Sequence, residues 1–299
     1  MTAADWTTIS HPQDIRLVVA DMDGTLLDEH SEIPDGFWPM LARLKSQGIE
    51  FVPASGRQYA TLRNMFADKA AEILGGGELS YIAENGNVVA LDGKVVEVHG
   101  IDLDVTRHVI DLVDEAAASG EHNVGLVICG LNSAYVQRSD KPFLDEVRKY
   151  YAALSIVDDL HAVLDVAQEP SAYKPGGGAE IVLKLAVLDL DGAERFTNEH
   201  LAHLRADYQV VVSGKLWVDI MNAETDKRQG VEALQCALGV TSAQTAVFGD
   251  YLNDRLMLEA GDWSFAMDNA HPDLKFAARY IAPSNVDHGV LKVLDRLIA

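Results

Sequence analysis

Short apolar runs alternate with segments of helical periodicity over the first part of the chain. Residues 15–20 form an almost unbroken apolar run, which predicts a buried strand. A helical pattern at about residues 37–47 follows, and the apolar run at residues 49–54 predicts a second strand. After another helical pattern, residues 80–83 predict a third strand. Strands that alternate with helices indicate a parallel sheet with right-handed crossovers.

The pattern changes between about residue 87 and about residue 221. Strand candidates become longer there, as at residues 124–129 and 179–188, and some follow one another directly. Ser213-Gly214-Lys215 joins two of them, which predicts an antiparallel hairpin. Two or three helical patterns lie between the strands. This part of the chain is therefore predicted to be a separate α+β module.

The last part of the chain returns to the first rhythm. A helical pattern is followed by an apolar run at residues 245–248 and by two further short runs. We therefore predict an α/β fold with a doubly wound parallel-sheet, Rossmann-like core made of residues 1–86 and 222–299. Residues 87–221 are predicted to form an inserted α+β domain.

Composition narrows the classes of partner. The chain has 299 residues, of which 48% are hydrophobic and 23% charged, as in ordinary globular proteins. Its formal net charge of −22 argues against nucleic acid as a partner. No apolar stretch is long enough to span a bilayer, and the N-terminal segment has no secretory pattern. Cys129 and Cys236 are expected to be buried thiols. We expect a cytoplasmic location and no membrane partner.

Two carboxylates follow the first predicted strand at once. Asp21 and Asp23 are costly to desolvate there unless something compensates their charge, and a hard divalent cation is a suitable compensation. An ionised Asp beside such a cation can act as a nucleophile, and the second Asp is placed to move a proton. The alternative is structural, because Asp-Gly is among the commonest turn pairs.

A second acidic group follows the predicted strand at residues 245–248. Asp250 is suited to bind the cation directly, and Asn253 and Asp254 are suited to hold its waters or to orient Lys227. The alternative role of these side chains is helix N-capping, which Asn and Asp perform well.

Two further segments offer groups that bind anions. Ser55-Gly56-Arg57 follows the second predicted strand and is predicted to open a helix, where free backbone N–H groups and a hydroxyl favour an oxyanion site. An ordinary Ser N-cap is the alternative. Lys227 lies where the chain re-enters the core; a lysine beside a phosphate would neutralise its oxygens, whereas a solvated surface lysine is the default. Ligands of open parallel sheets bind beyond the carboxyl ends of strands. The polar residues that follow predicted strands in this way are Asp21, Asp23, Ser55, Asp250, Asn253, Asp254 and Asn269.

These residues together resemble the haloacid dehalogenase-like (HAD) phosphatases, and more narrowly the Cof-type members with a large cap after the second motif. Four ordered motifs carry the resemblance: Asp21-Met22-Asp23-Gly24-Thr25, Ser55-Gly56-Arg57, Lys227, and Gly249-Asp250 with Asn253-Asp254. Glu84-Asn85-Gly86 and Ala266-Met267-Asp268-Asn269-Ala270 resemble further landmarks of the Cof-type proteins.

The resemblance implies a Mg²⁺-dependent phosphatase that acts on a small phosphorylated metabolite. A sugar phosphate is the default substrate, and nucleotide or cofactor phosphates such as pyridoxal phosphate stay open. It implies that Asp21 attacks phosphorus and that Asp23 serves as acid and base. Mg²⁺ would be held by Asp21, the main-chain carbonyl of Asp23, and Asp250; Ser55, Gly56 and Lys227 would hold the phosphate. Thr25, Arg57, Asn253 and Asp254 would support the site.

Two alternatives stay open at this point. A sugar phosphomutase shares the same acid and base arrangement but returns the phosphate to the sugar. A non-enzymatic phosphoaspartate switch would keep the phosphate on Asp21, although an acid/base at Asp23 favours turnover. The chain is expected to be a monomer or a small homo-oligomer.

Overall fold

The computed structural model describes residues 3–10 and 12–298 of the chain. It divides into two compact units. The first unit comprises Met1–Gly56, Leu62–Glu97 and Asp226–Ala299, and the second comprises Arg57–Thr61 and Val98–Thr225. Each unit contains its own sheet.

The sheet of the first unit has nine strands in the order β1-β16-β15-β14-β2-β3-β4-β5-β6. The strands are β1 (Ala4–Asp5), β2 (Leu17–Asp21), β3 (Glu50–Ala54), β4 (Tyr81–Ala83), β5 (Val88–Leu91), β6 (Lys94–Val98), β14 (Thr245–Gly249), β15 (Trp263–Met267) and β16 (Tyr280–Ala282). Pairing is parallel from β1 through to β4. The predicted α/β fold with a parallel, Rossmann-like sheet is confirmed.

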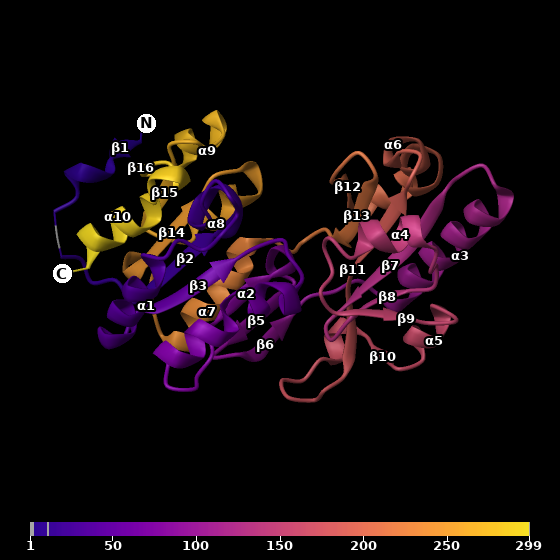
Figure 1. The fold of residues 1–299 in the computed structure, drawn as a ribbon, viewed down its shortest axis with the longest axis horizontal. Coiled ribbons are helices and arrows are strands. Elements are labelled where there is room, and N and C mark those ends of the chain that lie inside the picture. Colours follow the sequence, from indigo (N-terminus) through magenta and orange to yellow (C-terminus); the bar gives the residue numbers. More distant parts are fainter. Residues whose placement is uncertain (1–2, 11, 299) are drawn as a thin grey trace. The chain divides into compact units, whose positions relative to one another are not determined.

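Segments from the two ends of the sequence meet in this sheet. In Figure 1 the early strand β2 lies beside β14 from the last third of the chain, and the two pair in parallel. A central parallel strand is covered on both faces, and all five residues of β2 are buried. This burial accounts for the apolar residues that precede Asp21. The helices of this unit are α1 (Phe37–Ser46), α2 (Tyr59–Ile73), α7 (Lys227–Leu238), α8 (Arg255–Glu259), α9 (Pro272–Ala277) and α10 (Gly289–Leu297).

The chain does not leave the core at residue 86, as predicted, but continues in it to Glu97. Strands β5 and β6 extend the first sheet, and β5 pairs antiparallel with β4, with Val89 opposite Ile82. Residues 87–97 therefore belong to the first unit, and residues 222–225 belong to the second. Antiparallel strands after Gly86 carry the same sequence pattern as strands of the inserted module, so the pattern does not show which sheet they join.

The second unit is built on a mainly antiparallel sheet with the order β12-β13-β11-β7-β8-β9, and β10 pairs with β11. Its strands are β7 (Val124–Gly130), β8 (Ala134–Val136), β9 (Leu154–Ile156), β10 (Ala167–Gln168), β11 (Glu180–Asp189), β12 (Tyr208–Val212) and β13 (Trp217–Asn222). Its helices are α3 (Leu103–Ser119), α4 (Lys141–Val147), α5 (His161–Leu164) and α6 (Ala193–Phe196). The predicted antiparallel hairpin is confirmed as β12 and β13.

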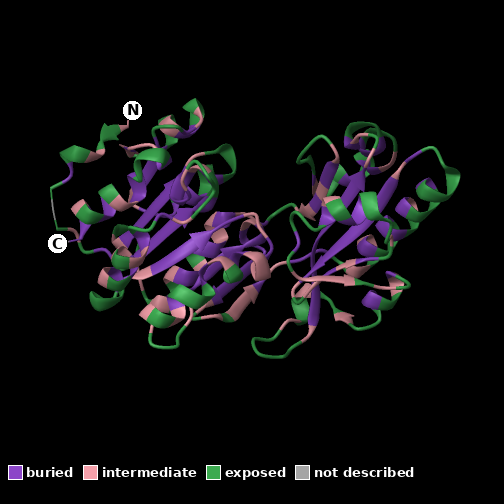
Figure 2. Cartoon of the chain, in the orientation of Figure 1, coloured by how far each residue is buried: buried purple, intermediate pink, exposed green. Residues whose placement is uncertain are grey.

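Burial follows the sheets in both units, since the strands in Figure 2 are mostly purple and the outer faces of the helices are green. In the second unit one apolar cluster includes Val109 of α3, Leu185 of β11 and Phe196 of α6. A second cluster includes Val127 of β7 and Phe143 of α4. Side chains alternate between the two faces of a strand, so one sheet supplies both clusters.

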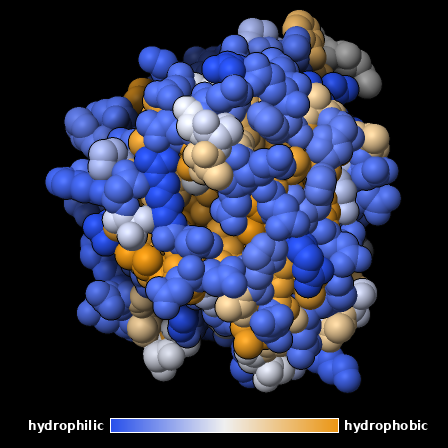
Figure 3. Space-filling view, turned by 90° about the vertical axis from the view of Figure 1, so that its right-hand side faces the viewer, coloured by the Kyte–Doolittle hydropathy of each residue, from blue (hydrophilic) through white to orange (hydrophobic). Residues whose placement is uncertain are grey.

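The surface reflects the charged composition. Hydrophilic side chains cover most of the face in Figure 3, and apolar ones show between them. Cys129 is buried as expected, but Cys236 is exposed, because it lies on the outer side of α7. Over residues 3–10 and 12–298, none of the helices combines the length and the apolar character that crossing a membrane requires.

Candidate active site

Strand register brings the predicted site residues of the core to one edge of the first sheet. Ala20 of β2 lies opposite Phe248 of β14, and Asp21 lies opposite Ala54 of β3. The residues that follow β14 and β3 therefore reach the same edge as Asp21. This is the edge at which parallel sheets bind ligands.

Three carboxylates and one ammonium group meet there. Carboxylate oxygens of Asp21, Asp250 and Asp254 all lie within 4.8 Å of one another. The Nζ of Lys227 donates to Asp21, and it donates to Oδ1 of Asp254 at 2.6 Å. Asp21 is 7% exposed, Lys227 1% and Asp254 0%, so water screens these charges little.

Asp254 is positioned by bonds on both of its oxygens. Oδ1 accepts from Lys227, and Oδ2 accepts from the backbone N–H of Asp250 at 3.1 Å and of Tyr251 at 3.4 Å. This leaves Asp21 and Asp250 as the carboxylates better placed to bind a ligand, with Asp254 fixing the lysine and the turn after β14.

Burial disfavours the charged forms of the acids in this cluster. Burial raises the pKa of Asp21 to about 8, although the Lys227 ammonium opposes the shift, and Asp254 and Asp250 add to it. Burial also raises the pKa of Asp250 to about 6, with a further contribution from Asp254. Burial acts to lower the pKa of Lys227, but Asp21 and Asp254 together hold it above its usual value. The cluster therefore has more negative charge than Lys227 alone balances.

The loop after β2 is shaped so that Asp250 can approach it. Gly24 has φ of +78°, and a Cβ at this position would lie 2.3 Å from Oδ2 of Asp250. Thr25 is buried, and its hydroxyl donates to Oδ1 of Asp250 at 3.3 Å. Only glycine satisfies both the left-handed backbone and the close approach of the carboxylate.

Replacing Gly24 by Ala is expected to lower turnover by about 100-fold, because displacing a reacting group by about 1 Å has effects of this size. Gly48→Ala is the matched control. Gly48 has φ of +69°, but apart from Gly48 itself and its two chain neighbours no heavy atom of the described residues lies within 4 Å of a Cβ there. That variant should carry only a backbone cost of about 1–2 kcal/mol and keep its turnover. Steady-state rates and urea unfolding of both variants check this, and equal turnover would contradict the close approach.

Two asparagines that the sequence analysis gave no role clamp this loop. The Nδ2 of Asn269 donates to the carbonyl of Gly24 at 2.8 Å, and its Oδ1 accepts from the backbone N–H of Asn285 at 3.1 Å. The Nδ2 of Asn285 donates to the carbonyl of Leu27 at 2.9 Å. The sequence already places Asn269 after a predicted strand and within a Cof-type landmark, but only the fold brings Asn285 to the loop.

The turn Glu84-Asn85-Gly86 packs against the start of α7. A Cβ on Gly86 would lie 2.2 Å from the carbonyl of Asp226. Asp226 caps α7 by accepting from the backbone N–H of Arg228 at 2.8 Å, and Lys227 is the first residue of that helix. This packing places the lysine beside the carboxylates.

The remaining predicted residues lie around this cluster or apart from it. Asp23 is exposed on the loop after β2. Ser55 is 2% exposed, and its backbone N–H donates to the carbonyl of Ile82 at 2.9 Å, so that amide is engaged in the sheet. Gly56 follows it and lies against the Asn85 side chain. Helix α2 begins only at Tyr59, so the expectation that a helix opens at Ser55 is wrong.

Arg57 and Asn253 are not part of the carboxylate and lysine cluster. Arg57 belongs to the second unit, and its support of the site stays a prediction. The exposed Asn253 donates to Oδ1 of Asn85 at 3.5 Å, which ties the turn after β14 to the turn after β4.

Comparison with known proteins identifies the family. Residues 18–294 match the family model of the haloacid dehalogenase-like hydrolases. The chain belongs to this family. It is 31% identical over 286 residues to an Escherichia coli protein, 5-amino-6-(5-phospho-D-ribitylamino)uracil phosphatase YbjI, over 95% of this chain and 96% of that protein. It is 24% identical to the Bacillus subtilis phosphatase YwpJ, over 95% of this chain and 100% of that protein.

A solved structure has the same fold as this chain. The crystal structure of TM0651 from Thermotoga maritima superposes with a TM-score of 0.79 at 24% identity, over 95% of this chain and 98% of that one. The resemblance derived from the four motifs is confirmed, and the enzyme class expected from it, a phosphatase, is confirmed with it.

The carboxylate cluster of this hydrolase fits a divalent cation. With all groups ionised, the three carboxylates and the one ammonium leave a formal charge of −2. The donor atoms are all oxygens, which hard cations such as Mg²⁺ prefer. The missing Cβ of Gly24 lets the Asp250 carboxylate lie close to the loop after β2. Asp21 and Asp250 can therefore supply ligands to such an ion.

Proposed function

We propose that this protein is a Mg²⁺-dependent phosphatase that hydrolyses small phosphorylated metabolites through a phosphoaspartate at Asp21. The observation that carries the proposal is the gathering of Asp21, Asp250 and Lys227 at the ligand-binding edge of the first sheet. A nucleophile, a cation site and a fixed positive charge at one place are the parts that phosphoryl transfer requires.

In the first step, a carboxylate oxygen of Asp21 attacks phosphorus, and the bond between phosphorus and the leaving oxygen breaks. Asp23 donates its proton to that oxygen, so the product leaves as an alcohol. Asp21 is buried and held by Lys227, whereas Asp23 is exposed on the adjoining loop. This contrast suits a fixed nucleophile beside an acid that exchanges protons with water.

In the second step, water attacks the phosphorus of the phosphoaspartate, and the Asp23 carboxylate takes a proton from that water. Inorganic phosphate leaves, and Asp21 returns to its carboxylate form. The Asn269 and Asn285 side chains hold the carbonyls of Gly24 and Leu27, so the loop that carries Asp23 keeps its geometry through both steps.

Several groups would stabilise the negative charge on the oxygens of the transferring phosphoryl group. We propose that Lys227 and the Ser55 hydroxyl, with the amide of Gly56, bind the phosphoryl oxygens. Mg²⁺, held by Asp21, Asp250 and the carbonyl of Asp23, would supply charge stabilisation for these oxygens when bound. Thr25, Asp254 and Asn253 would keep the ligands and the lysine in place, as their hydrogen bonds suggest.

The substrate class is proposed from the relatives. The Escherichia coli relative is named for a substrate with a phosphorylated ribityl chain. A phosphorylated sugar or polyol is therefore the first class to test for this chain. We propose that the second unit, residues 98–225 with residues 57–61, is the cap domain that selects the leaving group.

A panel of phosphorylated metabolites, including that ribitylaminouracil phosphate and common sugar phosphates, tests the proposal with purified protein. Release of inorganic phosphate is expected from one class. Formation of a phosphate isomer without release would instead indicate a phosphomutase. A long-lived phosphoaspartate without product, detected by mass spectrometry, would indicate a switch.

The affinity for Mg²⁺ is expected to depend on pH. The pKa of Asp250 is raised to about 6 and that of Asp21 to about 8, and a carboxyl must lose its proton before it binds a cation. The apparent Mg²⁺ affinity should therefore rise between about pH 5 and about pH 9. Calorimetric Mg²⁺ titrations across this range provide the measurement, and a chelator should stop turnover reversibly. Affinity that stays constant with pH, or activity that survives chelation, would contradict the carboxylate site.

A further inference from the structure

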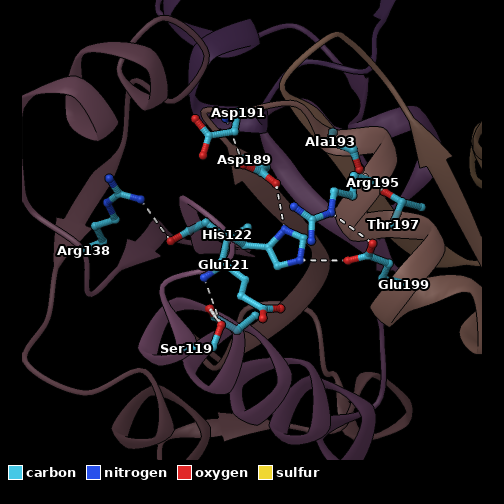
Figure 4. Close-up of polar contacts among 12 residues, drawn as sticks. Ser119, Glu121, His122, Arg138, Asp189, Asp191, Ala193, Arg195, Thr197 and Glu199 are labelled. Atoms are coloured by element: carbon cyan, nitrogen blue, oxygen red, sulfur yellow. Dashed lines mark hydrogen bonds and ion pairs between the residues drawn. The ribbon is translucent and has the colours of Figure 1, made fainter.

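A buried histidine of the second unit lies between two carboxylates. His122 lies in the connection between α3 and β7, and its side chain is 3% exposed. Its Nδ1 faces Oδ2 of Asp189 at 3.5 Å, and its Nε2 faces Oε2 of Glu199 at 3.1 Å. Figure 4 shows the imidazole between these two side chains, which come from the end of β11 and from the turn after α6.

A second histidine completes the group. His200 follows Glu199 in the π-helical turn Thr197–Leu201, and its ring packs edge-on against His122 at a centroid distance of 5.1 Å. One ligand atom from each of His122, Glu199 and His200 lies within 4.8 Å of the others. The buried Phe196 stacks on the His200 ring at 4.9 Å, which limits how far that ring can turn.

We propose that His122, Glu199 and His200 form a binding site for a zinc-like divalent transition metal ion. Two imidazole nitrogens and one carboxylate oxygen are a common set of protein ligands for zinc, with the fourth position left to water. Mg²⁺ prefers an all-oxygen environment, so this group and the carboxylates of the first unit select different ions.

Asp189 acts as the positioning residue of this site. It is 2% exposed and faces the nitrogen of His122 that is turned away from Glu199. A carboxylate at that nitrogen fixes the N–H there and directs the lone pair of the other nitrogen toward the metal. Metal-binding histidines usually have such a partner.

The two carboxylates that face the ring nitrogens of His122 favour a cation at this place. A neutral imidazole carries one N–H, and Asp189 and Glu199 are both acceptors when ionised. Both ring nitrogens of His122 face carboxylate oxygens, and a neutral imidazole can donate to only one of them, so the other nitrogen turns a lone pair toward a carboxylate unless a proton or a metal ion lies there. Arg195 donates to the other oxygen of Glu199 at 3.0 Å, which orients Oε2 toward His122.

The metal would join two segments that are distant in the sequence. His122 precedes β7, and Glu199 and His200 follow α6, so a bound ion links the two connections at this end of the sheet. Zinc should therefore stabilise the second unit as well as bind to it.

The test is a zinc titration of the whole chain with a chromophoric zinc chelator as competitor. Excess Mg²⁺ is present throughout, so that the carboxylates of the first unit stay occupied. One zinc ion per chain is expected to bind, with a rise in the melting temperature. Asp189→Asn should weaken binding by about 10–100-fold. His200→Ala, which removes a half-buried ligand, should reduce binding at least as much without unfolding the chain.

Two variants separate this site from other zinc-binding groups. His203→Ala removes an exposed histidine of the same region, which pairs with His108 through Nε2 atoms 3.2 Å apart, and it should leave zinc binding unchanged. Asp250→Asn removes a core carboxylate and should also leave it unchanged. The proposal is overturned if no stoichiometric zinc binds, if binding survives His200→Ala, or if binding is lost in either of these two variants.

Discussion

Asp21→Asn is expected to lower turnover of a generic phosphomonoester by about 10⁴–10⁶-fold, as loss of the nucleophile does in other covalent enzymes. The amide cannot form the phosphoaspartate. The fold should persist, because Asn has the same shape and can still accept from Lys227. Burial raises the pKa of Asp21 to about 8, so the neutral side chain also avoids the desolvation of a charge. Steady-state phosphate release and circular dichroism of the variant provide the measurements.

Asp262→Asn is the matched control for this substitution. Asp262 pairs with Arg279 at 3.0 Å on the surface of the first unit, and its loss should leave turnover unchanged. Substantial activity in Asp21→Asn would refute the nucleophile. A misfolded variant would be evident from its spectrum, so loss of activity by unfolding is distinguishable from loss of chemistry.

Lys227→Met is expected to lower the free energy of unfolding by about 3–5 kcal/mol, because it leaves buried carboxylates without their partner. Lys227 is 1% exposed and donates to both Asp21 and Asp254, so no water replaces the lost ammonium. Turnover should also be lost, since a fixed positive charge near the phosphoryl oxygens is removed. Urea unfolding in the presence of a chelator, together with phosphate release, provides the measurements.

Two further variants show whether charge balance is the cause. Lys149→Met removes an exposed lysine that pairs with Glu146, and it should not change stability measurably. Adding Asp254→Asn to Lys227→Met removes one of the stranded carboxylates and should recover part of the stability but none of the turnover. Stability of Lys227→Met equal to that of the original chain would show that the ammonium does not neutralise the cluster.

The two proposed metal sites differ in how readily the sequence alone reveals them. Asp21, Asp23 and Asp250 directly follow or adjoin the ends of apolar runs, so the parallel-sheet rule already brings them to one edge. His122, Glu199 and His200 have no regular spacing. They meet only because β7 and β11 pair antiparallel, with Val124 opposite Asp189, which sets the residues before β7 next to those at the end of β11.

The sequence by itself determined the alternation of strands and helices, the antiparallel hairpin of β12 and β13, and the placement of Asp21 and Asp250 after buried strands. These features are local, because hydrophobic periodicity and turn residues act within a few positions. Only the tertiary structure decided that β5 and β6 extend the first sheet, and that Asn269 and Asn285 clamp the Gly24 loop. The sequence left open whether Asp254 holds water on the cation or orients Lys227, and the tertiary structure shows it bonded to Lys227 and to the backbone N–H of Asp250. These contacts join residues far apart in the chain, and their partners are set by strand register and packing, which no short stretch of sequence encodes.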